Sequence, residues 1–246
     1  MSMRYKGGVI SATAPTTSTS AASGVWTLPQ QLQAIAAGNW TGIPLVIGQA
    51  YQGGFFAGQI STAGNGVADY NLVVGPVASA EGYLAWKNAA TATPGADSTV
   101  NGAQNTADMV ADGNATVYPI AHFCNDLTIG GFTDWYLPAK FELEICYFNL
   151  KPSTAGNLNT VGANPYSVPT RTGNYSSGSP ASNPAQTTST AFRGTGTEYF
   201  NASANYVGSN ETSTTNAYMK FFGNGADDSD NKTFPFNFRA IRRVAV

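Results

Sequence analysis

The sequence predicts an α+β fold built on an antiparallel sheet. Short strand-like runs come first, helices follow, a long loop-rich stretch comes next, and strand-like runs return at the end of the 246-residue chain. Strands and helices that are segregated in this way favour an antiparallel sheet with flanking helices. A hydrophobic fraction of 42%, with 12% aromatic residues, supplies enough apolar surface for a substantial core.

Residues 1–42 are expected to form an extended N-terminal arm that ends in a short docking helix. After Ile10 the first 24 residues carry almost no large apolar side chain, so they cannot bury enough surface to fold alone. Pro29 then begins a helix, and Gly38 ends it. Packing of this helix on the main body is an equally open alternative to docking. The expected docking side chains are Trp26, Leu32, Ile35 and Trp40.

From residue 43 the pattern changes to strands and then to helices. The runs "IPLVIGQAY", "GGFFAGQIS" and "YNLVVGP" read as strands between glycine, asparagine and aspartate turns. Helices are expected over residues 103–112 and 117–127. Two strands are expected at the end, over 217–222 and 236–246, joined by a polar loop.

The most firmly specified element is a helix that begins near Pro138. Proline suits a first helical turn because its missing N–H has no partner there. Lys151 and Pro152 end the helix, and the long loop region that follows, residues 153–190, is of a length that is usually functional or poorly ordered. A buried stripe recurs at three- and four-residue spacing. Its members are Leu143, Cys146, Tyr147 and Leu150.

Composition excludes several classes of protein. Charged residues make up only 11% of the chain, against roughly 25% in typical soluble domains, and the net charge of −2 provides no field for nucleic acid. No run approaches the ~18 apolar residues of a membrane span, and the first residues lack a secretory signal, so we expect no membrane insertion and folding in a cytoplasm. Cys124 and Cys146 are expected to be reduced, with a disulfide as the less favoured alternative.

The stretch "AHFCNDLTIGGFTDWYLPAKFELE" resembles the signature of the DUF1566 and Lcl-type domains, which have a C-type lectin-like fold. The resemblance spans roughly residues 45–246 and implies that residues 43–246 form one such domain, with two helices flanking an antiparallel sheet. It departs from the family at "NYVGSNE", where Val207 replaces a tryptophan. The matching residues are Cys124, Gly130, Gly131, Asp134, Trp135, Leu137, Pro138, Glu142, Leu143, Phe222, Gly225, Arg239 and Arg242.

The resemblance also implies roles for four residues at the start of the long helix. Asp134 would bind nearby backbone N–H groups, and Trp135 would lie in the core. Pro138 and Glu142 belong to the same structural signature.

The first 40 residues look like an N-terminal segment that recurs on structural proteins of marine and freshwater tailed phages. Arm and lectin-like body together imply a virion protein, assembled in the cytoplasm of a host bacterium and attached through the arm to other virion proteins. Symmetric positions on a particle favour a homo-oligomer, with a trimer as the leading expectation.

In the lectin-like fold the last hairpins form the ligand face, and here they are rich in tyrosine, asparagine and aspartate. Such a composition is typical of adaptable binding surfaces, although the same residues also solvate turns. The aspartates and asparagines of the polar loop could bind calcium, but their spacing is not that of an EF-hand, and we expect no other cofactor or metal. The candidate ligand-binding residues are Tyr206, Asn210, Tyr218, Asn224, Asp227, Asp228, Asp230 and Asn231.

Three functions remain open, of which we favour the first. The protein is a tail fibre or adhesin that recognises a host surface glycan or protein, a capsid decoration or structural cap without a host ligand, or a cell-wall glycosidase. The last would need two carboxylates among Glu142, Glu144 and Glu211. The sequence has no nucleophile elbow, phosphate-binding loop or HExxH motif, and its one histidine, His122, is expected to be structural. We therefore expect no enzymatic activity.

Overall fold

The computed structural model describes residues 17–18, 21–22 and 45–246. The chain divides into two units, residues 1–45 and 46–246. In the first unit, strands β1 (Thr17–Ser18) and β2 (Ala21–Ala22) pair in antiparallel orientation. The expected docking residues Trp26, Leu32, Ile35 and Trp40 lie outside the described residues.

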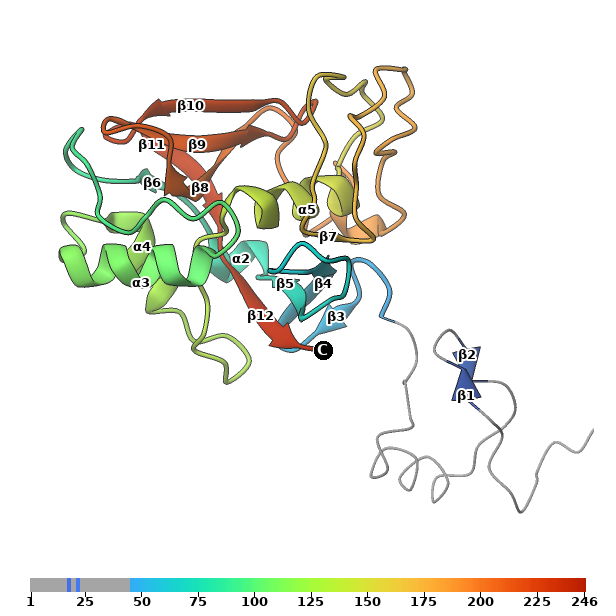
Figure 1. The fold of residues 1–246 in the computed structure, drawn as a ribbon, viewed down its shortest axis with the longest axis horizontal. Helices are drawn as coiled ribbons and strands as arrows, with labels where there is room; N and C mark the ends of the chain where they lie inside the picture. Colours follow the sequence, from blue (N-terminus) through green and yellow to red (C-terminus); the bar gives the residue numbers. More distant parts are fainter. Residues whose placement is uncertain (1–16, 19–20, 23–44) are drawn as a thin grey trace, which may run out of the picture. The chain divides into compact units, whose positions relative to one another are not determined.

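The second unit is a mixed α+β body with more sheet than helix, which confirms the predicted class (Figure 1). Four α-helices and a 3-10 helix lie among its strands in the described part of the chain. In chain order the elements are β3 (Ala50–Tyr51), β4 (Gly54–Ile60), β5 (Tyr70–Val74), α2 (Val77–Ala80), β6 (Glu81–Ala85), α3 (Gly102–Asp112), α4 (Pro119–Asn125), α5 (Lys140–Leu150), β7 (Ser167–Val168), η1 (Thr190–Phe192), β8 (Asn205–Glu211), β9 (Asn216–Phe221), β10 (Asp227–Asn231), β11 (Pro235–Arg239) and β12 (Ile241–Ala245).

The described strands of the second unit form two five-stranded sheets. The first has the order β10-β9-β8-β11-β6, and its neighbours are antiparallel except β8 and β11, which pair in parallel at Tyr206 and Asn237. The second has the order β12-β5-β4-β3, with β7 added to β4 at Gln59 and Val168, and is antiparallel throughout. The predicted antiparallel arrangement therefore holds for every pair but one.

The C-terminal strands differ from the sequence-based expectation. The expected strand over residues 236–246 is two strands that belong to different sheets, and the chain crosses between the sheets at Ala240, whose N–H donates to the Ala80 carbonyl. The expected polar loop contains strand β10, which pairs with β9 from Asp227↔Lys220 to Asn231↔Asn216. That loop prediction is wrong because strand propensity is weak and a partner strand overrides it.

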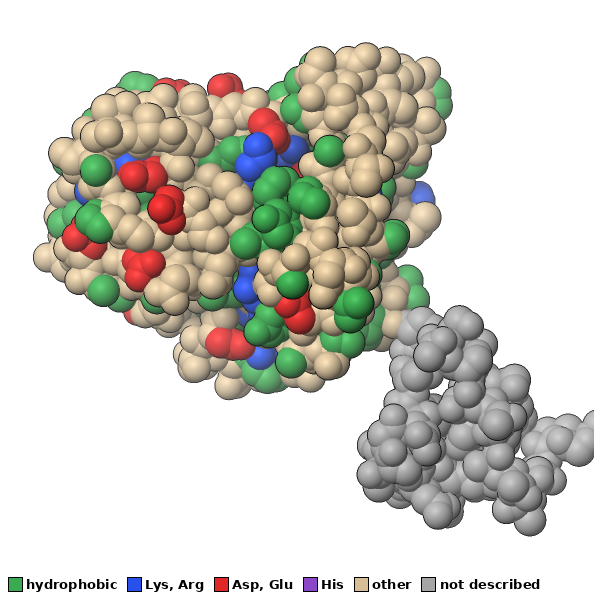
Figure 2. Space-filling model, in the orientation of Figure 1, with side chains coloured by type: hydrophobic (Ala, Val, Ile, Leu, Met, Phe, Trp, Pro, Cys, Tyr) green, Lys and Arg blue, Asp and Glu red, His purple; other side chains and the backbone are tan. Residues whose placement is uncertain are grey.

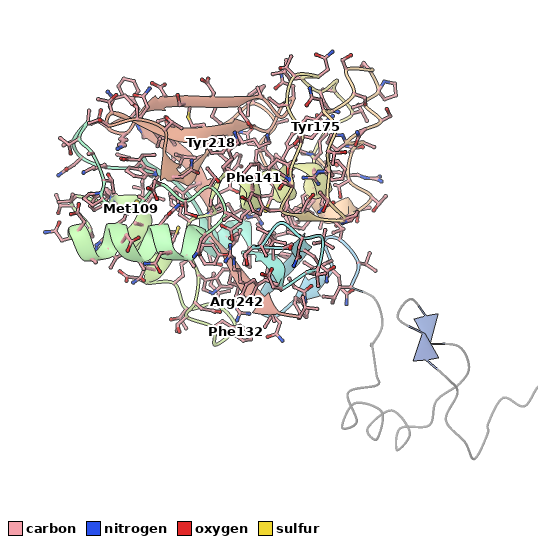
Figure 3. The ribbon with its side chains drawn as sticks, viewed as in Figure 1. Met109, Phe132, Phe141, Tyr175, Tyr218 and Arg242 are labelled. Atoms are coloured by element: carbon pink, nitrogen blue, oxygen red, sulfur yellow. The ribbon has the colours of Figure 1, made fainter. Side chains whose placement is uncertain are left out.

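The core consists of two clusters of buried side chains. One surrounds α5 and contains its whole predicted stripe, Leu143, Cys146, Tyr147 and Leu150. The other lies between α3, α4 and the first sheet, where Figure 3 places Met109 of α3. Cys124 and Cys146 are buried and unbridged, as predicted, and burial raises the pKa of both thiols. Among the described helices, none has the length and apolar character needed to cross a membrane.

Candidate functional site

Helix α5 begins at Lys140, and Glu142 ties its first turn to two distant parts of the chain. The Glu142 side chain is fully buried. Its Oε2 accepts hydrogen bonds from the backbone N–H groups of Ala139 (2.8 Å) and Gly102 (3.0 Å). Its Oε1 accepts from the Tyr136 hydroxyl (2.5 Å) and from Arg243 Nε (2.8 Å). One carboxylate thus joins the starts of α3 and α5 to the C-terminal strand β12.

Among the described residues, no backbone N–H group donates to Asp134, although the resemblance implies that such groups would. Its carboxylate instead forms a bidentate ion pair with Arg242, with Nε to Oδ1 at 2.6 Å and Nη2 to Oδ2 at 2.9 Å. Arg242 also lies over the Phe132 ring, 3.9 Å from the centroid, and donates to the Gln52 carbonyl (Figure 3). Trp135 lies in the core and Pro138 is buried. The "GGFTDW" segment is therefore fixed to β12 by an arginine far away in the sequence.

Three of the candidate ligand-binding residues are buried, so the expectation that they form an exposed face is wrong. Tyr206 of β8 and Tyr218 of β9 belong to the core cluster around α5, and Asn210 of β8 is 3% exposed. The Tyr206 hydroxyl donates to Glu81 (3.2 Å) and accepts from the Asn201 N–H. Asn210 Oδ1 accepts from the N–H of Lys140 (3.0 Å), so it supports the first turn of α5.

Asp227 is at the centre of a charged cluster that joins β9, β10 and α5. Its Oδ1 accepts from the Tyr218 hydroxyl (2.8 Å) and from Lys220 Nζ (2.7 Å), and its Oδ2 lies 3.0 Å from Lys140 Nζ. Burial by itself would raise the pKa of Asp227, but the two ammonium groups outweigh burial and hold that pKa below its usual value. The structure thus brings the candidate residues Tyr218 and Asp227 together, and it adds two lysines that sequence reasoning missed.

The remaining candidate residues lie on or beside the outer strand β10. Asp228 and Asp230 are exposed, and each accepts a hydrogen bond from the next residue's N–H. Asn224 and Asn231 are partly exposed and accept backbone N–H groups of the turns next to β10. Acidic side chains on an outer strand discourage pairing with a further sheet. Within the described ranges, no group of three or more histidine, cysteine, aspartate or glutamate side chains is placed to hold a metal ion.

The carboxylates considered for hydrolysis are each bound to a cation. Glu142 pairs with Arg243, Glu144 with Arg171, and Glu211 with Lys232. Glu144 also accepts from the hydroxyl of Tyr175 (2.5 Å). His122 contacts the Gly113 carbonyl through Nε2 at 2.7 Å. These contacts favour structural roles for all four residues.

The segment between α5 and β8, residues 151–204, is held in place by buried polar side chains. Nδ2 of Asn157 donates to the carbonyls of Ser176, Asn183 and Pro184, and its Oδ1 accepts from the Tyr147 hydroxyl. A second buried asparagine, Asn164, donates to the Phe141 carbonyl and to Glu144. The proline-rich loop signal pointed to this segment, but no local pattern identifies these two asparagines among the many in the sequence.

A patch of hydrophobic side chains lies where this segment meets the start of α5. Figure 2 shows the patch in the middle of one face, with charged side chains above it, and Figure 3 places Phe141 there. The ring of Phe141 lies 5.1 Å from that of Tyr166, which belongs to the loop segment. The Lys140 ammonium lies 5.8 Å from the centroid of Phe141. This mixture of aromatic and cationic groups suits a ligand with both apolar and polar faces.

Lys151, the first residue of the loop segment, makes stability depend on pH. Its fully buried ammonium donates to the Ala155 carbonyl, and burial lowers its pKa from 10.5 to about 8. Between these two values the unfolded chain binds more protons than the folded chain, so folding becomes more favourable as pH rises. Relative to a Lys151→Met variant, we expect the free energy of unfolding to rise by about 3 kcal/mol across this window. Urea unfolding of both proteins from neutral pH to pH 10 checks this, and a constant difference between them would contradict it.

No model of a known protein family matches the chain, and no curated protein matches it significantly.

Proposed function

We propose that the protein is a non-enzymatic recognition component of a tailed-phage particle, a tail fibre or adhesin. Residues 1–42 attach it to other virion proteins, and the body, which has a C-type lectin-like fold, presents the segment 151–204 to a glycan or protein on the host surface. This moves the ligand face from the last hairpin to the loop segment, because Tyr206, Asn210 and Tyr218 are buried.

The proposal depends on one observation: the long segment 151–204 has little regular secondary structure but is fixed by buried polar side chains. Within it the described regular structure is limited to β7 and η1. Even so, Lys151 and Asn157 are buried and hydrogen-bonded to carbonyls of the segment, and the buried Asn164 ties the segment to Phe141 of α5. A loop that only connects α5 to β8 would need neither this length nor buried polar side chains. Long loops fixed on a rigid scaffold are typical of binding surfaces.

The lectin-like fold is supported by what the resembling residues do. Trp135 lies in the core, Glu142 joins α3, α5 and β12, and Arg242 holds the segment before α5. Arg239 is buried, donates to the Gly75 carbonyl at 2.7 Å and pairs with Glu198 at 2.7 Å. Residues far apart in the resembling signature thus make the contacts that close the fold.

The test places a bulky polymer on one of two faces. Because both native cysteines are buried, a thiol-reactive polyethylene glycol will modify only an introduced, exposed cysteine. Ser177→Cys carries the polymer on the loop segment and Asp228→Cys on strand β10, and both positions are exposed. We expect the unmodified full chain to compete with phage for adsorption to host cells, and the polymer at position 177 to weaken that competition at least tenfold.

The polymer at position 228 is expected to change the competition less than twofold. The reverse result would return the ligand face to the last hairpin. If the unmodified full chain does not compete at all, recognition is wrong and capsid decoration becomes the better proposal. Cryo-electron microscopy of the particle would then show the protein on the head lattice and not at the tail.

A further inference from the structure

A small hollow lies between β4, α5 and β7, at the base of the segment 151–204. Its volume is about 80 Å³. An engineered cavity of about 150 Å³ accepts benzene, so this hollow suits a side group of a ligand and not a whole sugar ring. Its apolar lining includes Ile145, Phe148 and Val168.

Four polar side chains also line the hollow, and three of them retain hydrogen-bonding capacity. The fourth, Ser167, already donates its hydroxyl to the carbonyls of Asn164 and Pro169. Gln59 donates through Nε2 to Asn71, and Asn149 donates through Nδ2 to the Ala57 carbonyl. Among the described residues nothing donates to the amide oxygen of either side chain. The third is Arg171, whose buried Nε–H has no partner in the described part of the chain. The lining therefore combines apolar walls with two amide oxygens that nothing among the described residues donates to, and Arg171 adds an N–H that is buried and unpartnered.

The charge of Arg171 is already neutralised. Its Nη2 pairs with the carboxylate of Glu144, which is 4% exposed, and its guanidinium stacks over Phe148 with its carbon 3.8 Å from the ring centroid. An anionic ligand would meet the charge of Glu144 as well as that of Arg171, so this arginine offers no net attraction for a carboxylate or phosphate. A neutral group with one acceptor and one donor fits better.

We propose that the hollow binds the acetamido group of an N-acetylated amino sugar. The methyl group would pack against Ile145 and Val168. The carbonyl oxygen would accept from Arg171 Nε, and the N–H would donate to the amide oxygen of Asn149 or Gln59. This inference rests on the proposed recognition function and names its ligand class.

The test compares N-acetylglucosamine with glucose, which differ in the acetamido group. Both are titrated into the isotopically labelled full chain, and binding is followed by NMR. We expect saturable binding of N-acetylglucosamine and at least tenfold weaker binding of glucose, with shifts confined to residues around the hollow. Equal binding of the two sugars, or no binding of either, overturns the proposal.

Two variants test the geometry. Val168→Phe fills the hollow and is expected to abolish binding, whereas Val67→Phe, at a site that is 68% exposed, is its control. Arg171→Lys keeps a cation beside Glu144 but removes the Nε–H, and we expect at least fivefold weaker binding with an unchanged melting temperature. Unaltered binding in both Val168→Phe and Arg171→Lys overturns the proposal.

The results separate this inference from the function on which it rests. If the full chain competes for adsorption but N-acetylglucosamine does not bind, the acetamido site is wrong and recognition stands. If the sugar binds at the hollow but the chain does not compete for adsorption, the site stands and the proposed function is wrong.

Discussion

Replacing Glu142 by alanine is expected to lower the free energy of unfolding by about 3 to 5 kcal/mol, enough to unfold much of the protein at 37 °C. The side chain is fully buried and accepts four hydrogen bonds. Its removal leaves Arg243, whose side chain is 12% exposed, without its carboxylate. It also leaves the N–H groups of Gly102 and Ala139 without their acceptor. Urea unfolding followed by circular dichroism measures the loss.

Asp126→Ala is the matched control for this variant. Asp126 is an exposed carboxylate at the end of α4, and its side chain bonds only the neighbouring Asn125 among the described residues. Exposed substitutions of this kind change stability by about 0.5 kcal/mol or less. Equal unfolding midpoints for Glu142→Ala and Asp126→Ala would show that Glu142 does not hold the three elements together.

The elements that depend on local signals could be predicted from the sequence. Helix α5 was specified by a proline near its start, a repeating apolar stripe and a proline after its end, and the structure places it at Lys140–Leu150. The two helices before it, α3 and α4, also fall within two residues of their expected ranges. In each case the deciding contacts lie within a few residues along the chain, so a sequence pattern records them.

The candidate site could not be predicted, because the same types of polar residue occur both on binding surfaces and as hydrogen-bonded groups in the core. Tyrosine and asparagine are typical of adaptable binding loops, but Tyr206, Asn210 and Tyr218 use the same groups to satisfy hydrogen bonds inside the core. Their partners are distant in sequence, as with Asn210 and Lys140, which are 70 residues apart. Amino-acid composition shows which polar groups are present, but it does not show which of them will be buried against a distant hydrogen-bond partner.

The low charge content likewise does not show where the charged side chains lie. From the sequence, the low charge content indicated that the protein has no field for nucleic acid. In the structure, several of the few cations are buried and paired, including Lys220 with Asp227, Lys232 with Glu211 and Arg239 with Glu198. Removing one member of such a buried pair leaves an uncompensated charge, which is strongly destabilising. These buried pairs therefore hold strands and loops together, while other carboxylates, such as Asp228 and Asp230, remain exposed.

Trp135→Ala is expected to lower the free energy of unfolding by about 3 to 5 kcal/mol, the cost of truncating a buried aromatic residue. The side chain is 2% exposed and donates from Nε1 to the Phe132 carbonyl at 3.1 Å. Two glycines leave room for the indole, because a Cβ built on Gly54 or Gly75 would lie 3.1 or 3.2 Å from its ring carbons. Since glycines have no side chain that could move into the space, the cavity cannot collapse easily.

Tyr83→Ala is the control for Trp135→Ala, because it removes an aromatic ring that is 62% exposed on β6, and its expected cost is about 0.5 kcal/mol or less. Tyr218→Ala should destabilise the protein as Trp135→Ala does, because it removes a ring that is 2% exposed and a hydrogen bond to Asp227. Any loss of host adsorption in that variant would therefore report on folding and not on a ligand contact. Thermal melts of the three variants decide the matter. Equal melting temperatures for Trp135→Ala and Tyr83→Ala would mean that the indole does not organise this core. The Asp134–Arg242 pair would then be the contact that holds the segment before α5.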